Sequence, residues 1–246
     1  MTAEEMLYRA EVGYDIITGH AAEGISKKEW STFLTGAQMD VVKIHLPTSP
    51  TLLTFELTEL LKNQFSELVS YTQNVDHVPG VNLPNSYLFE IPDNYMYGLL
   101  GSIKYKDKPC LDGVYTKVKP ISYNYYDLNV DNPYKEVNDK MAWRLVTSST
   151  GQNKKQHDVI AKYEPSVYKL TYLKIPDPII VYEAEFNSDD SEIQGVKLSS
   201  LSASMHCEMN ELLHDNIVEK AILRAQVAMG DAQSAQLTGA VISQLH

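Results

Sequence analysis

The spacing of apolar residues changes twice along this chain, and that change limits the folds available to it. Before residue 78 and again after residue 210, apolar side chains recur every three or four positions, as on one face of a helix. Between these regions prolines become frequent and the pattern shortens toward alternation, which is typical of short strands. The sequence therefore predicts an α+β protein whose two ends are helical and whose centre is a β part.

Four helices are predicted. The first covers residues 4–18, and the second begins at a capping box, because Ser26 and Glu29 can each accept a hydrogen bond from the other's backbone amide. Ser49 marks the start of a third, and a closing helix is predicted over 210–230. The second helix carries the clearest apolar stripe, formed by Trp30, Phe33, Leu34, Ala37, Val41 and Ile44.

The central part contains seven predicted strands, at residues 87–91, 95–105, 114–121, 140–148, 158–164, 167–175 and 179–183. Their short lengths and intervening turn residues favour an antiparallel β-sandwich or small barrel. The polar, glycine-containing segment 147–156 is predicted to be a hairpin loop that reaches into solvent.

These patterns divide the chain into four parts. Residues 1–78 form an N-terminal helical part, 79–200 an antiparallel β domain, and 201–230 a closing helix that packs on the helical part. Residues 231–246 form an extended C-terminal tail, which has too few apolar residues to be ordered alone. We expect its apolar residues to contact another protein chain: Leu237, Val241, Ile242 and Leu245.

Charge and composition limit the possible partners. The formal net charge is −11 and the lysines do not cluster, so the sequence does not predict tight binding to nucleic acid phosphates. The chain has 16 tyrosines against 5 phenylalanines, and tyrosine is common in sheets and protein interfaces.

Two further features concern the compartment. No run approaches the ~20 consecutive apolar residues of a membrane span, and the acidic N-terminus is unlike an export signal. Cys110 and Cys207 lie far apart without metal-ligand spacing, so we predict two reduced, buried thiols, as expected of a protein made in the cytosol.

A candidate metal loop lies in the stretch YDLNVDNPYKEVNDK. Asp127, Asn129 and Asp131 match the alternating ligands of a helix–loop–helix calcium site. That site also needs a glycine at its sixth position and a glutamate at its twelfth, where this chain has Asn132 and Asn138. We therefore interpret the stretch as a turn in which Asn and Asp side chains bind loop backbone groups, and predict no metal.

A candidate catalytic group consists of His206, Cys207 and Glu208, with His214 close in sequence. A Cys–His nucleophile pair is one interpretation, and ordinary packing at the start of a helix is the favoured one. No phosphate-binding glycine loop, nucleophile elbow or dinucleotide fingerprint occurs in the sequence. We therefore predict a protein that is not an enzyme and needs no cofactor.

Several stretches together resemble a known family. They are ISKKEWSTFLTGAQMDVV, YLFEIPDNYMYGLLG, NPYKEVNDKMAWRL, YKLTYLKIPDPIIVYEAEFN and CEMNELLHDNIVEKAILRA, in this order. The chain is similar in these stretches to virion structural proteins of tailed phages, above all the crAss-like phages. Its predicted architecture also resembles the adaptor of short-tailed phages.

The resemblance implies a structural protein that closes into a ring of about twelve identical copies. Such a ring would stack under the portal at the head–tail junction or upper tail, beside neighbouring ring proteins, and help to form the DNA channel. The acidic composition agrees with this expectation, because a negative wall repels phosphate and lets double-stranded DNA pass without tight binding.

Two alternatives stay open. One is a β-rich tail module that binds a receptor through the 147–156 loop, and the other is a hydrolase that uses Cys207 and a histidine.

Overall fold

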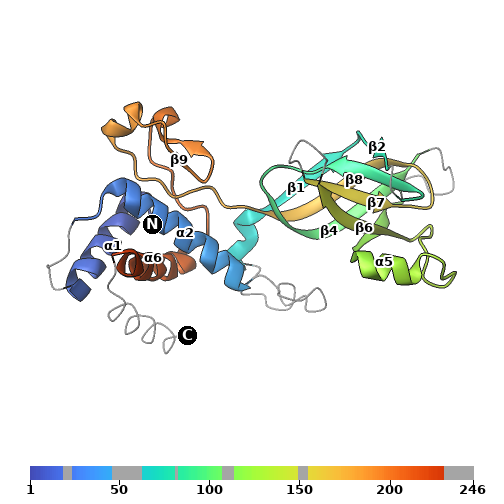
Figure 1. Ribbon diagram of the computed structural model, residues 1–246, viewed down its shortest axis with the longest axis horizontal. Helices are drawn as coiled ribbons and strands as arrows, with labels where there is room; N and C mark the ends of the chain where they lie inside the picture. Colours follow the sequence, from blue (N-terminus) through green and yellow to red (C-terminus); the bar gives the residue numbers. More distant parts are fainter. Residues whose placement is uncertain (19–23, 46–62, 81–82, 107–113, 149–154, 230–246) are drawn as a thin grey trace. The chain divides into compact units, whose positions relative to one another are not determined.

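The computed structural model describes residues 1–18, 24–45, 63–80, 83–106, 114–148 and 155–229. They form two compact units (Figure 1). The helical unit comprises Met1–Leu68 and Pro176–His246, and the β unit is the insertion Val69–Ile175. The predicted α+β class is confirmed. Most of the helix predicted from Ser49 and the whole 231–246 tail lie outside the described residues.

Three helices form the core of the helical unit: α1 (Ala3–Thr18), α2 (Lys27–His45) and α6 (His214–Ala228). The predicted capping box begins α2, where the Ser26 amide donates to Glu29 at 2.9 Å and the Glu29 amide donates to Ser26 Oγ at 3.3 Å. Helix α6 buries the small residues Ala221 and Ala225. A Cβ at Gly13 of α1 would lie 2.6 Å from Ile222 Cδ1 of α6, so a larger residue there would force the Ile222 side chain to move.

Short elements complete the helical unit. They are η1 (Ser66–Leu68), η3 (Ala184–Ser188), the hairpin of β9 (Glu192–Ile193) and β10 (Val196–Lys197), η4 (Leu198–Ser200) and η5 (Glu211–Leu213). Three of their buried side chains form a small apolar cluster with Ile180: Phe186, Ile193 and Leu198.

The chain returns from the β unit along α2. Thr35 Oγ1 donates to the Ile179 carbonyl and accepts from the Ile179 amide, both at 3.1 Å. One turn before it Ser31 Oγ accepts from the Val181 amide, and one turn after it Gln38 donates to the Asp177 carbonyl. The predicted strand at 179–183 is therefore wrong. Its backbone is satisfied by helix side chains, and it makes only the isolated bridge Ile180–Met205.

Replacing Thr35 with valine tests this connection. The Thr35→Val variant keeps the side-chain shape but leaves a buried N–H and C=O without a partner, so we expect the free energy of unfolding to fall by about 2 to 4 kcal/mol. Thr32→Val is the matched control, because Thr32 is exposed on the same helix and its hydroxyl donates to the Lys28 carbonyl of that helix. Urea unfolding measures the free energy of unfolding of the two variants. An equally small loss of stability in both would contradict the role given to Thr35.

The β unit is built on one sheet of eight strands: β1 (Val69–Asn74), β2 (Val78–Pro79), β3 (Ser86–Glu90), β4 (Tyr95–Tyr105), β5 (Thr116–Pro120), β6 (Met141–Ser148), β7 (Lys155–Ile160) and β8 (Pro165–Lys174). Their order in the sheet is β1-β8-β4-β5-β6-β7-β3-β2. The β5–β6 pair is parallel, and the other neighbouring pairs are antiparallel.

The sheet is curled. Its two edge strands, β1 and β2, are joined by only the three residues 75–77, so the opposite edges must approach each other. The Asn74 side chain of β1 donates to the Glu90 carbonyl of β3. Across the interior, the rings of Phe89 in β3 and Tyr168 in β8 lie 5.0 Å apart, although these strands are far apart in the sheet order. This single curled sheet is closer to the predicted barrel than to the predicted sandwich.

A short helix covers part of the outer side of the sheet. Helix α5 (Tyr123–Asn129) begins at Ser122, whose side chain accepts from the Tyr125 amide, and lies near β6 in Figure 1. The rings of Tyr125 and Tyr126 meet Trp143 edge-on at 5.9 and 6.2 Å. Trp143, Leu145 and Ile160 are thereby buried under α5, a helix that the sequence analysis did not predict.

The inside of the curled sheet holds a buried polar cluster. His157 Nδ1 lies 2.9 Å from the Tyr168 hydroxyl, and the Arg144 guanidinium lies within 3.5 Å of the same hydroxyl and of the Gly98 carbonyl. A Cβ at Gly98 would lie 2.6 Å from that guanidinium, so the glycine makes room for it. Burial and, to a lesser extent, Arg144 lower the pKa of His157 to about 3, while burial raises the pKa of Tyr168 to about 12.

His157 should make the stability depend on pH. Its imidazole stays neutral in the folded chain but binds a proton in the unfolded chain below about pH 6.5. The unfolded state therefore takes up more protons between about pH 6.5 and pH 3, and stability falls by about 1.4 kcal/mol per pH unit on acidification. The free energy of unfolding of wild type and His157→Gln can be measured by urea unfolding at several pH values. Plotted against pH between about 3 and 6.5, it should fall more steeply on acidification for the wild type, by about 1.4 kcal/mol per pH unit. Equal pH dependence of the two proteins would contradict this role of His157.

The unit boundaries differ from those predicted, 69–175 against 79–200. Strand β1 was not predicted, because VSYTQN has no strong apolar alternation. Residues 176–200 were predicted in the β part, although they pack in the helical unit. The strand predicted at 158–164 corresponds to β7, which begins three residues earlier and covers Lys155–Ile160. The predicted loop 147–156 is shorter, since Thr147 and Gln156 are paired in the sheet.

Candidate assembly surfaces

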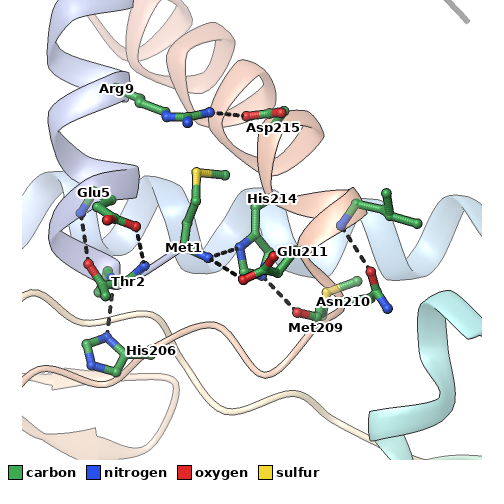
Figure 2. A network of polar contacts seen from close by, with 12 residues as sticks. Met1, Thr2, Glu5, Arg9, His206, Met209, Asn210, Glu211, His214 and Asp215 are labelled. Atoms are coloured by element: carbon green, nitrogen blue, oxygen red, sulfur yellow. Dashed lines mark hydrogen bonds and ion pairs between the residues drawn. The ribbon is translucent and has the colours of Figure 1, made fainter.

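The candidate catalytic histidines hold the beginning of α1 in place. Figure 2 shows Thr2 and Glu5 in a capping box, with the Ala3 amide donating to His206 Nδ1 at 3.0 Å. His214 Nδ1 lies 3.0 Å from the Met1 amino group, and its Nε2 lies 2.8 Å from the Met209 carbonyl. Burial lowers the pKa of His214, which favours the neutral ring that can accept from the ammonium. These contacts serve to join α1 to α6.

Cys207 and Glu208 do not form a reactive pair. Burial raises the pKa of the Cys207 thiol to about 11, the opposite of the shift that activates a nucleophile. Glu208 accepts a hydrogen bond from the Asp177 amide, in the segment that returns from the β unit. This geometry gives no support to the hydrolase alternative.

The raised thiol pKa can be measured by alkylation. In a Cys110→Ser background, Cys207 should react with iodoacetamide near pH 8 on the order of a hundredfold more slowly than a free thiol, because so little thiolate is present. Mass spectrometry follows the adduct, and urea-unfolded protein is the control that restores ordinary reactivity. Reaction of the folded chain at the free-thiol rate would contradict the assignment.

The acidic stretch at α5 forms a helix end and a turn. Asp127 lies in α5, while Asn129 is buried and donates to the Tyr125 carbonyl at 2.8 Å. Beyond it, the Asn132 side chain accepts from the Tyr134 amide, as predicted for a turn, and Asp131 is exposed. Among the described residues, no three His, Cys, Asp or Glu side chains gather as metal ligands. None of the described helices is long and apolar enough to span a membrane.

One candidate surface lies on α1. Its buried face contains Leu7, Ala10 and Tyr14, whereas Ile17 is exposed. The opposite face carries Tyr8, Val12 and Ile16 at helical spacing, with 68%, 39% and 71% of each residue exposed. We call these three residues the α1 stripe. Apolar residues in line on the solvent side of a helix indicate a contact with another molecule.

A second candidate surface lies on the β unit, outside the part covered by α5. The neighbouring strands β1, β8, β4 and β5 contain five lysines and no Asp or Glu. The register aligns Lys169 with Ser102 and Ser102 with Lys117, and aligns Thr171 with both Tyr71 and Leu100. Tyr71 and Leu100 are 58% and 63% exposed. We call the side of these strands that bears Tyr71, Leu100, Lys117 and Lys169 the basic sheet face.

Charge is unevenly divided between the units. The helical unit carries 8 Lys and Arg against 21 Asp and Glu, a formal net charge of −13, whereas the β unit carries 13 against 11, or +2. The whole-chain value of −11 conceals this division.

Comparison with known proteins identifies the chain. The family described as Phage tail ring protein 3/4 matches residues 1–237, which include all described residues of both units. The chain belongs to this family. It is thus a structural ring component of a phage tail, as the resemblance implied, and no catalytic family is indicated.

Two similar proteins come from one phage, Bacteroides phage crAss001. This tail ring protein is 26% identical over 240 residues to its "Ring protein 4/5", covering 95% of this chain and 96% of the relative. It is 28% identical over 222 residues to "Ring protein 3", covering 87% of this chain and 88% of the relative.

The contact residues predicted from the sequence differ from these two surfaces. Leu237, Val241, Ile242 and Leu245 lie outside the described residues and stay a prediction. The α1 stripe was not predicted, although Tyr8, Val12 and Ile16 are each four residues apart, as on one face of a helix. The basic sheet face had a sequence signal as well, since the strands at 95–105 and 167–175 contain lysine and no acid. The sheet order that makes them neighbours was not available from sequence.

Proposed function

We propose that this tail ring protein closes into a ring of about twelve copies that stacks below the portal, at the head–tail junction, and surrounds the path of the DNA. The observation that carries the proposal is the family match over residues 1–237, because the match extends through both units. A chain whose copies contact one another through two different surfaces forms a closed ring when the rotation between copies closes.

The division of charge supports a role at the DNA channel. A wall formed by the helical unit, with its net charge of −13, would repel phosphates, so that DNA moves past it without being retained. We further propose that the C-terminal segment 231–246 contacts a neighbouring chain through Leu237, Val241, Ile242 and Leu245.

Native mass spectrometry of the purified protein and electron microscopy of the virion test this function. We expect cyclic oligomers, a ring density next to the portal, and no retention of a DNA duplex in a gel-shift assay. A variant truncated after residue 230 should assemble more weakly than the full chain. A chain that stays monomeric at every concentration and is absent from purified virions would overturn the proposal.

A further inference from the structure

The α1 stripe and the basic sheet face lie on different units, and each exposes apolar side chains to water. Two different patches on one chain are what a heterologous contact needs, because copy after copy can join through the same pair of patches. An isologous contact would instead use one patch twice.

The charges of the two surfaces are complementary. Helix α1 carries Glu4, Glu5, Glu11 and Asp15 against the single cation Arg9, and Arg9 is already paired with Asp215 at 2.6 Å. All the charged side chains in the four strands of the basic sheet face are lysines. Opposite fields of this kind steer two surfaces together and disfavour contacts between like surfaces.

The sizes also agree. A helix of 16 residues is about 24 Å long, and the ten residues of β8 extend over about 33 Å, so α1 fits along the sheet. A helix about 10 Å wide covers two or three strands at ~4.8 Å spacing. Tyr71 and Leu100, which flank Thr171 on two such strands, can therefore both reach one helix.

We propose that the α1 stripe of one copy packs against the basic sheet face of the next copy around the ring. This rests on the proposed ring function and assigns its subunit contact. The apolar side chains Tyr8, Val12 and Ile16 cover Tyr71 and Leu100, while the acids of α1 face Lys117 and Lys169. The helical unit of each copy thus binds the β unit of its neighbour.

A protein surface fits the basic sheet face better than DNA does. Its exposed Tyr71 and Leu100 would gain nothing from a phosphate backbone, and its four strands contain lysine but no arginine. The Lys169 ammonium lies 4.1 Å from the centre of the Tyr115 ring, an arrangement in which one lysine is already held by an aromatic neighbour.

Two surface variants test the contact. Leu100→Asp with Lys117→Glu places negative charge on the basic sheet face. Asp15→Lys with Ile16→Lys places positive charge on and beside the α1 stripe. Matched controls make similar changes at exposed residues elsewhere: Tyr134→Asp with Lys135→Glu on the β unit, and Glu185→Lys with Val227→Lys on the helical unit. Circular dichroism verifies that all four fold like the wild type.

The two surface variants should each be monomeric where the wild type and both controls assemble, as measured by native mass spectrometry and sedimentation. Mixed in equal amounts, they should form a dimer and nothing larger. In that mixture, one variant still has its α1 stripe, the other still has its basic sheet face, and only one contact can form. Rising salt should weaken wild-type assembly.

Other outcomes overturn the inference. If the wild type assembles but the mixture stays monomeric, or if either surface variant still assembles, these surfaces are not the contact, and the ring function stands. If the variant with Leu100→Asp and Lys117→Glu assembles normally but loses affinity for a DNA duplex that the wild type binds, the basic sheet face binds DNA instead. If the wild type never assembles and is also absent from purified virions, the ring function itself falls.

Discussion

The two-unit architecture depends on the hydrogen bonds between α2 and the chain that returns from the β unit. The inserted unit begins at Val69 and ends at Ile175, so the returning segment must be anchored next to residues far away in sequence. Ser31, Thr35 and Gln38 supply that anchor from successive turns of one helix. Because a buried, unpaired backbone group costs about 1–3 kcal/mol, this segment has one favourable position along α2.

The curled sheet lets one layer of strands make a core and still present a free surface. Its interior is filled by large aromatic residues such as Phe89 and Tyr168, and α5 covers part of its outer side. On the outer side of β1, β8 and β4, Tyr71 and Leu100 are exposed among the described residues, and these apolar side chains beside lysines make this side suited to a partner. Folding of the β unit and assembly of the ring therefore use opposite sides of the same strands.

Local signals predicted much of the fold. The capping box at Ser26 and the bounds of β4 are as the sequence predicts, because both depend on residues close together in the chain. The segment at 179–183 has the apolar character of a strand, but its hydrogen-bond partners come from a helix about 144 residues earlier. No local pattern contains that information. The same holds for the polar cluster of Arg144 and His157, whose burial results from the closing of the sheet.

The sequence by itself determined most of the helices and strands and, through several distinctive stretches, the resemblance to phage ring proteins. These depend on composition and on short spacings. The tertiary structure decided which strands are neighbours, and hence that lysines from three separate strands lie in one acid-free part of the sheet. It also decided that the acids gather in the other unit, since the helical unit is formed from both ends of the chain. Net charge is a property of sequence, but the field that a partner meets depends on where folding places each charge.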